Sequence, residues 1–336
     1  MSLRGDEIAV VYNVAGAPRT HAVAIPPLPP RGAAPVVPPR PTSFVSGAWP
    51  ACAAGGAFTY CARGTTLLAY RRGPDGVPAA EGKKIVEVRG PTKLAATALG
   101  KDHAVAVFID ERTTTEGKTR QAFGVVDDGL PVRVSEDGSG ATVVDVAPHR
   151  DGALILYVDA RTSMTPIHAR VARLDAGKPQ LVLERDAVLA IGGSAERGLS
   201  GVLASTGKDA FALVPMPEGS SAFGLAIVKV GDPPKEDAPL AWSRYPNGLD
   251  PAPVAATTSG SPPRVLRARP LDATFNGPRV LELGHLDDAG NFRSDAILEP
   301  GTPMAEVAIL ADTRGSVWLL HGDATGTWLE RRTCER

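Results

Sequence analysis

The chain of 336 residues has few aromatic side chains, almost no net charge and no long apolar run. Five tyrosines and four tryptophans are few for a surface that stacks on carbohydrate rings. The 36 basic and 37 acidic residues leave a net charge of -1, which gives no long-range attraction for nucleic acid or anionic membrane. No stretch approaches the ~20 apolar residues that span a bilayer. We therefore predict neither nucleic-acid binding nor membrane insertion.

Helical periodicity is also missing over any useful length. The chain instead contains 36 glycines and 31 prolines, while its apolar fraction of 43% is too high for a disordered chain. Many tight turns between short strands explain both numbers. The composition therefore predicts an all-β protein.

An apolar, β-rich run restarts seven times along the chain. The restarts lie at nearly regular steps of 50, 46, 50, 57, 54 and 52 residues, at Ile8, Phe58, Ala104, Leu154, Phe211, Val265 and Val317. A period of roughly 40 to 50 residues is typical of β-propeller blades, which bury their faces only by stacking. We predict one propeller domain over residues 1–336, built from four-stranded blades and closed by pairing of the N- and C-terminal strands. Seven blades are favoured, with six as the alternative.

The clearest repeat unit spans residues 141–186. Four apolar runs at 141–147, 153–158, 167–174 and 180–184 alternate with turn residues such as the Asp151-Gly152 pair. This pattern predicts a four-stranded meander. The following segment, 187–208, is the least regular part of the chain and is expected to carry an extra loop.

A proline-rich segment interrupts the first repeat at residues 26–41. Proline at this density favours polyproline II and excludes a central strand. We predict a stiff connector on the rim of the propeller. Residues 26–31 also fit a ligand pattern for SH3 domains, which is the alternative.

The cysteines and the N-terminus bear on the cellular compartment. Cys52 and Cys61 flank a turn, so they could face each other across adjacent strands at disulfide distance. The alternatives are a bridge from Cys334 to the start of the ring, or three reduced cysteines. Residues 1–6 have no signal-peptide character, and a strand begins at Ile8. A secreted or periplasmic protein whose leader has been removed is expected, with a cytoplasmic protein as the alternative.

The best candidate site is an arginine that recurs at one place in the repeat. Its four copies are Arg63, Arg112, Arg161 and Arg269, preceded two residues earlier by Cys61, Asp110, Asp159 and Arg267. Matching places in different blades lie on a ring around one axis, so four guanidinium groups could bind a carboxylate, sulfate or phosphate. Asp110 and Asp159 would orient two of the arginines. The alternative is that these side chains join neighbouring blades.

Residues 94–186 resemble the Asp-x-Arg blades of secreted bacterial propellers, which are distantly similar to the sialidase and BNR-repeat class. The resemblance rests on the sequences Tyr-Val-Asp-Ala-Arg at 157–161 and Ile-His-Ala-Arg-Val at 167–171. It implies an extracellular propeller and does not imply catalysis. The Arg-Ile-Pro segment and complete Asp boxes of sialidases are missing, since 135–139 only begins like such a box. Sialidase activity is therefore not expected.

Other catalytic patterns are missing as well. The chain has no Gly-x-Ser-x-Gly elbow, and its six histidines show no zinc-ligand spacing, so we predict no metal and no cofactor. The predicted function is a monomeric, non-catalytic binding or scaffold module that presents loops at the mouth of the central channel to a protein or glycan. The alternative is a glycoside hydrolase or lyase with two carboxylates in an axial pocket.

Overall fold

The fold is all β, as the sequence predicts. The computed structural model describes residues 2–4, 7–13, 19–25, 41–46, 51–89, 93–99, 102–114, 117–136, 140–159, 164–174, 180–184, 186–193, 201–218, 222–230, 245–248, 254–270, 279–298, 306–311, 316–322 and 327–333. Within these ranges every regular element is a strand, and none is a helix long and apolar enough to cross a membrane. The proline-rich segment at 26–40, Arg161 and Cys334 lie outside the described residues.

The strands form seven small antiparallel sheets, which we call blades 1 to 7 in chain order. Blade 1 contains β1 (Ser2–Arg4), β2 (Glu7–Asn13), β3 (Arg19–Ile25) and β4 (Thr42–Ser46). Blade 2 contains β5 (Ala51–Gly55), β6 (Phe58–Arg63), β7 (Thr66–Arg71) and β8 (Lys83–Glu87). Blade 3 contains β9 (Leu94–Leu99), β10 (His103–Thr114), β11 (Gly117–Val126) and β12 (Val132–Arg133).

The other four blades follow in the same order. Blade 4 contains β13 (Ala141–His149), β14 (Gly152–Asp159), β15 (Met164–Leu174), β16 (Leu181–Leu183) and β17 (Ala187–Gly193). Blade 5 contains β18 (Val202–Ser205), β19 (Ala210–Glu218), β20 (Ala222–Val230) and β21 (Tyr245–Gly248). Blade 6 contains β22 (Val254–Ala256), β23 (Arg264–Pro270), β24 (Arg279–Leu286) and β25 (Phe292–Leu298). Blade 7 contains β26 (Glu306–Ala311), β27 (Ser316–Gly322) and β28 (Thr327–Thr333).

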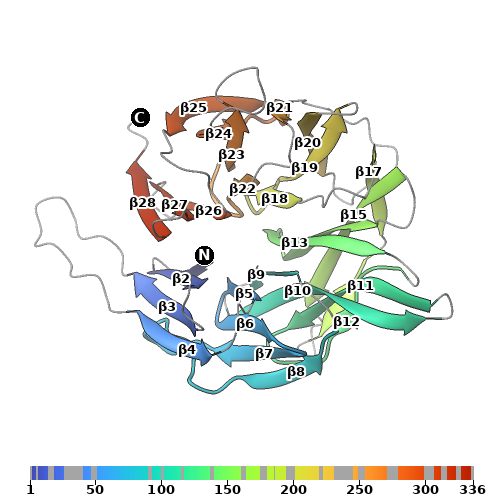
Figure 1. The fold of residues 1–336 in the computed structure, drawn as a ribbon, viewed down its shortest axis with the longest axis vertical. Coiled ribbons are helices and arrows are strands. Elements are labelled where there is room, and N and C mark those ends of the chain that lie inside the picture. The colour runs from blue at the N-terminus through green and yellow to red at the C-terminus, as the bar shows by residue number, and fades with distance from the viewer. Residues whose placement is uncertain are drawn as a thin grey trace, which may run out of the picture.

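The blades surround one axis, and the first strand of each blade lies nearest to it (Figure 1). The predicted seven-bladed propeller is therefore confirmed. The four strands predicted between residues 141 and 184 are β13 to β16. The irregular segment after them supplies a fifth strand, β17, which pairs with β15.

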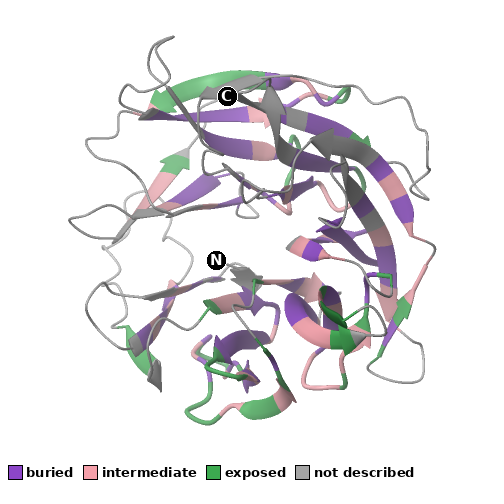
Figure 2. Ribbon diagram, turned by 45° about the vertical axis from the view of Figure 1, so that its right-hand side comes forward, coloured by how far each residue is buried: buried purple, intermediate pink, exposed green. Residues whose placement is uncertain are grey.

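Most of the core lies in the seams between neighbouring blades. Every residue of β14 is buried because its side chains alternate between two seams. Ile155 and Tyr157 pack toward blade 3, whereas Leu154 and Leu156 pack toward blade 5. Buried residues consequently run along the middle strands (purple in Figure 2). A middle strand therefore reads as a continuous apolar run.

The first strands approach each other closely enough to require small residues. A Cβ at Gly55 of β5 would lie 2.5 Å from the carbonyl oxygen of Thr97 in β9. Only glycine allows this contact between the backbones of blades 2 and 3. The small residues of these strands therefore set how tightly the blades close around the axis.

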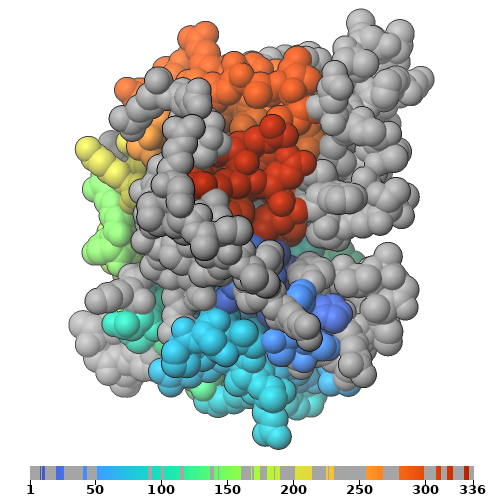
Figure 3. All heavy atoms as spheres, turned by 90° about the vertical axis from the view of Figure 1, so that its left-hand side faces the viewer, coloured from blue at the N-terminus to red at the C-terminus, as the bar shows by residue number. Residues whose placement is uncertain are grey.

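The predicted closure by pairing of the terminal strands is wrong for the described residues. Strands β1 to β4 build blade 1 from N-terminal residues alone, and β26 to β28 build blade 7 from C-terminal residues alone. The short strand β1 supplies the opening strand of blade 1. Apolar contacts close the ring instead, since Ile8 and Val10 pack with Leu310 and Trp318. In Figure 3 the C-terminal strands, in red, lie against N-terminal strands in blue.

Truncating Trp318 to alanine is expected to weaken this closure. The change should lower the free energy of unfolding by about 3–5 kcal/mol because it empties the seam between blades 7 and 1. Leu319→Ala, at the next residue of β27, empties the seam to blade 6 and is the matched control. Urea denaturation measures both losses. Hydrogen exchange in β2 and β3 should rise only in the Trp318 variant, and an equal rise in both variants would contradict this account of closure.

Candidate functional site

The position two residues before each recurring arginine is buried in all four repeats. Its occupants, Cys61, Asp110, Asp159 and Arg267, expose between 0% and 5% of their surface. Each lies in the second strand of its blade. The occupants are of three residue types, and each type has a different kind of bonding partner.

In blades 3 and 4 the position holds an aspartate that binds the chain leading into the first strand. Asp110 Oδ1 accepts a hydrogen bond from the Arg89 backbone N–H at 2.6 Å, and Asp159 Oδ1 accepts one from the Gly140 N–H at 2.9 Å. Each aspartate thus anchors the incoming connection of its own blade. Hydrogen bonds to a charged acceptor of this kind contribute about 1.5–3 kcal/mol.

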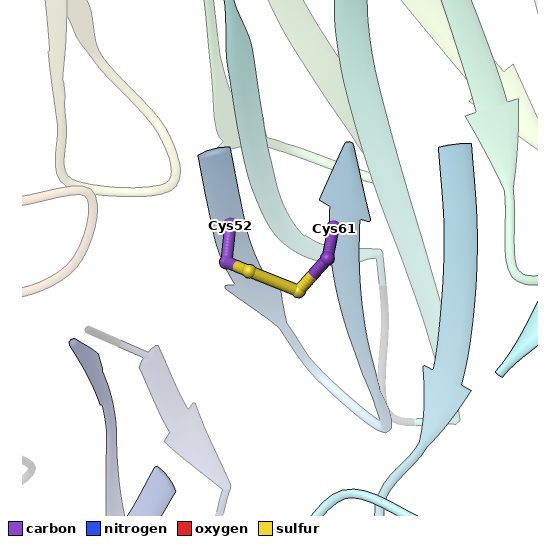
Figure 4. Close-up of a disulfide and its surroundings, with 2 residues drawn as sticks. All are labelled: Cys52 and Cys61. Atoms are coloured by element: carbon purple, nitrogen blue, oxygen red, sulfur yellow. A yellow bond between two sulfur atoms is a disulfide. The ribbon is translucent and has the colours of Figure 1, made fainter. Parts of the chain in front are cut away.

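In blade 2 a disulfide takes the place of this hydrogen bond. Cys61 of β6 is bonded to Cys52 of β5, its direct partner in the strand register, with an S–S distance of 2.11 Å and a Cα–Cα distance of 4.2 Å (Figure 4). This is the first of the pairings considered from the sequence. The covalent bond joins the second strand to the first strand near the start of the latter.

In blade 6 the position holds a cation with its own counter-ion. Arg267 of β23 donates from Nε to Glu282 Oε2 at 2.8 Å, and its Nη2 lies 2.7 Å from the same oxygen. The guanidinium also lies 4.9 Å from the ring centre of Phe292. Both charged side chains are more than nine-tenths buried, so removing either one would leave an uncompensated charge in the core.

The recurring arginines lie just beyond this buried position. The first and second strands of a blade are antiparallel, so the second strand ends on the side where the first strand begins. An isolated parallel bridge from His149 to Gly207 indicates that neighbouring first strands run in the same direction. We call the end of the ring where β6, β10, β14 and β23 finish the upper face. The three arginine positions that lie in described strands, Arg63, Arg112 and Arg269, therefore belong to one face of the propeller.

The structure describes two of the four arginine side chains. Arg63 is exposed at the end of β6. Arg112 exposes 38% of its side chain, its Nε lies 2.6 Å from Asp110 Oδ2, and its guanidinium lies 5.2 Å from the ring centre of Phe123. Arg269 belongs to β23, but its side chain lies outside the described part of the chain, as does Arg161. The arginine ring remains a prediction.

A buried polar cluster lies in the seam between blades 3 and 4. The Tyr157 hydroxyl donates to Asp186 Oδ2 at 2.5 Å, and His168 Nδ1 lies 2.7 Å from the same oxygen. The two rings stack with their centres 4.5 Å apart. Burial, and after it the hydrogen bond to Asp186, raises the pKa of the Tyr157 hydroxyl. The equivalent pair in blade 3 is apolar, since Phe108 stacks on Phe123 at 5.7 Å.

Sequence reasoning missed this cluster. Tyr157 and His168 are direct partners across β14 and β15, as Phe108 and Phe123 are across β10 and β11. The replacement of two phenylalanines by tyrosine and histidine at one place in the repeat was the available signal. The contribution of Asp186 was not visible, because it comes from the connection between β16 and β17.

The first strands of the blades lie nearest to the axis, and we call them the axial wall (Figure 1). This wall carries little charge. Among the side chains that the structure describes on the first strands, the only carboxylate is Asp145 of β13. Its Oδ2 accepts a hydrogen bond from the Leu203 N–H of β18 at 2.6 Å, which joins blades 4 and 5. Burial raises the pKa of Asp145 from 3.8 to about 6. Among all the residues that the structure describes, no group of three or more His, Cys, Asp or Glu side chains could hold a metal ion.

Comparison with known proteins yields similar folds only. No protein-family profile matches the chain, and no curated protein matches it. The solved structures that it resembles include an exo-1,5-α-L-arabinanase from a bovine ruminal metagenomic library, with 8% identity over 69% of this chain and 90% of the other and a TM-score of 0.36. They also include a family-32 β-fructofuranosidase from Bombyx mori, with 9% identity, 79% and 66% coverage and a TM-score of 0.41. A fucose-specific lectin from Aleuria aurantia has 13% identity, 89% and 97% coverage and a TM-score of 0.38.

These neighbours include both glycan-binding and glycan-cleaving propellers. At such low identities and TM-scores they carry no information about the site. The chain is a seven-bladed β-propeller with distant structural neighbours among lectins and glycoside hydrolases.

Removing the disulfide is expected to destabilise the protein. The bond closes a loop with a sequence separation of 9 residues, so replacing both Cys52 and Cys61 by alanine should cost about 2–3 kcal/mol of unfolding free energy. Urea denaturation measures the loss. A thiol reductant should destabilise the wild type by a similar amount and leave the double variant unchanged. Equal stability of the wild type with and without reductant would contradict a structural role.

Replacing Asp145 by asparagine is expected to stabilise the protein at high pH. Because the pKa of Asp145 is higher in the folded chain than its ordinary value, the folded chain binds the proton more tightly, and stability falls as the pH rises from 4 to 6. Asparagine keeps an acceptor for the Leu203 N–H without the charge. The variant should therefore have a higher melting temperature than the wild type at pH 8 and the same melting temperature at pH 4.

Asp145→Ala is the control for this experiment, because it removes the acceptor and should lower the melting temperature at both pH values. Thermal melts at pH 4 and pH 8 decide the matter. The same difference between the wild type and the asparagine variant at both pH values would contradict the proposed charge effect.

Proposed function

We propose that the chain is a non-catalytic binding module whose upper face holds a glycan. The composition of the axial wall carries this proposal. Cleavage of a glycosidic bond by two carboxylates needs both groups about 5–9.5 Å apart. On the described first strands, Asp145 is the one carboxylate with a described side chain, and the backbone of Leu203 occupies its Oδ2. This wall supports binding better than hydrolysis.

The distribution of apolar side chains favours a glycan over a protein partner. A stable protein interface needs a contiguous apolar core with aromatic anchors. The large hydrophobic side chains exposed in the described part of the chain are Leu130, Val182 and Ile297, which expose 82%, 51% and 52%. They belong to blades 3, 4 and 6, so they do not form one patch. A polar ligand is the better match to such a surface.

The binding site that we propose is the ring of Arg63, Arg112, Arg161 and Arg269, with Asp110 and Asp159 orienting two of the arginines. The geometry of Arg112 supports this role. Its Nε faces Asp110 and its plane lies over Phe123, which fixes the guanidinium. A fixed guanidinium with its Nη edge still available can bind a carboxylate or sulfate through two parallel hydrogen bonds.

The disulfide supports a place outside the cytoplasm. Disulfides form and persist in secreted and periplasmic proteins, whereas the cytosol keeps thiols reduced. The bond between Cys52 and Cys61 therefore agrees with the resemblance of residues 94–186 to secreted bacterial propellers. We propose a secreted or periplasmic protein.

Titration calorimetry with matched neutral and acidic oligosaccharides tests the binding function. Arg63→Gln and Arg112→Gln, each made alone, should weaken binding of an acidic oligosaccharide at least tenfold, or about 1.4 kcal/mol. Arg332→Gln is the control, since Arg332 is exposed on β28 beside the start of β27, at the opposite face.

The same samples test the alternative function. Release of reducing ends from any of the oligosaccharides would show a glycoside hydrolase, and release of unsaturated sugars would show a lyase. Equal binding by all three arginine variants would contradict the proposed site, and no binding of any oligosaccharide by the wild type would contradict the proposed function.

A further inference from the structure

A cluster of basic residues surrounds the end of β10 on the upper face of blade 3. The Ile109 N–H donates to the Lys93 carbonyl at 3.1 Å, and the Glu111 N–H lies 3.4 Å from the Arg89 carbonyl. Arg120 of β11 is the direct register partner of Glu111. Three segments of the chain therefore bring the backbones of Arg89, Lys93 and Arg120 close to the end of β10. Lys93 and Arg120 share the face of the sheet that holds Glu111, whereas Arg112 points to the other face. We call these three residues the blade 3 basic cluster.

The carboxylates nearest to this cluster each contact a cation outside it. Asp110 is paired with Arg112 at 2.6 Å, and Glu111 lies 3.7 Å from the Lys118 ammonium. Glu87 accepts a hydrogen bond from Lys84 at 2.7 Å, although the Arg89 charge also acts on it. Among the described residues, no ion pair joins the blade 3 basic cluster to an acidic side chain. The cluster therefore presents positive charge at the upper face.

The charges of Lys93 and Arg120 act on each other. The side chains of Arg89, Lys93 and Arg120 are all exposed. Burial by surrounding atoms, and after it the Arg120 guanidinium, lowers the pKa of the Lys93 ammonium. Like charges held this close destabilise each other, and a bound anion would relieve the repulsion.

We infer that the blade 3 basic cluster is a second subsite, adjacent to Arg112, for an anionic group of the bound glycan. The group would be a sulfate ester or a uronate carboxylate, since guanidinium forks bind both through paired hydrogen bonds. This inference rests on the proposed glycan-binding function. It adds that the ligand extends outward from the arginine ring along blade 3 and carries a second anionic group there.

The decisive variant is the triple substitution Arg89→Gln, Lys93→Gln and Arg120→Gln. A matched control is Arg71→Gln, Lys83→Gln and Lys84→Gln, which removes three exposed charges from the lower end of blade 2. Dextran sulfate and polygalacturonate serve as acidic probes, and unmodified dextran is the neutral probe. Each variant is first checked by circular dichroism and a thermal melt.

The cluster variant is expected to bind at least one acidic probe more than tenfold less tightly than the wild type, while the control variant changes less than twofold. The loss should shrink at high salt because exposed charges are screened. Inorganic sulfate, compared with chloride at equal ionic strength, should raise the melting temperature of the wild type more than that of the cluster variant. The sulfate melts need no glycan.

The outcomes separate this inference from the proposed function. Equal binding by the two triple variants, with loss in Arg112→Gln, would overturn the subsite and leave glycan binding intact. Binding of the neutral probe alone would likewise overturn the subsite. Binding of no glycan by the wild type would overturn the proposed function, and an equal effect of sulfate on the two triple variants would then overturn the anion site as well.

Discussion

In blades 2, 3 and 4 the architecture depends on one linkage, which ties the second strand of a blade to its first strand or to the chain entering it. A first strand such as β9 or β22 is short and lies at the edge of its own sheet, so few of its contacts are local. An anchor at the end of the second strand fixes where the first strand of the same blade begins. Asp110 and Asp159 supply it as hydrogen bonds to the incoming backbone, and Cys61 supplies it as a covalent bond. Arg267 of blade 6 instead joins the second strand to the third through Glu282. The buried position two residues before the recurring arginine thus forms a bond in each of these blades, as a hydrogen bond, a disulfide or an ion pair.

This linkage also explains why an arginine recurs two residues later. Residues i and i+2 of a strand point to the same side of the sheet, so the arginine follows the buried anchor on the same seam. Arg112 shows the result, because it pairs with Asp110 while more than a third of its side chain remains exposed. Its aliphatic part and ring contact belong to the seam, and its guanidinium edge belongs to the upper face. Structural and binding roles can therefore coexist at one position. The sequence pattern alone could not separate them.

How far the sequence predicted the fold follows from the range of each interaction. The strands between 141 and 184 were predictable because apolar runs and Asp-Gly turns are local signals. The closure was mispredicted because β1 has only three residues and no periodic pattern, so blade 1 seemed incomplete. The contacts of Asp186 with Tyr157 and His168 were not predictable, since they depend on the register of β14 against β15 and on the path of the chain after β16. The anchoring aspartates were named from the repeat, but their backbone partners required coordinates.

The distribution of charge decides where a ligand can act. Ionised groups in the core form ion pairs, as Arg267 does with Glu282. The described axial wall holds mainly small uncharged side chains. Asp145 interrupts that wall, and burial raises the pKa of its carboxyl group. At the upper face, strand ends leave Arg63, Arg89 and Arg120 exposed on a scaffold fixed by the anchors beneath them. Because these side chains add little to the packing in the seams, they can be substituted to suit a different ligand. The buried anchors meanwhile keep the blades in place.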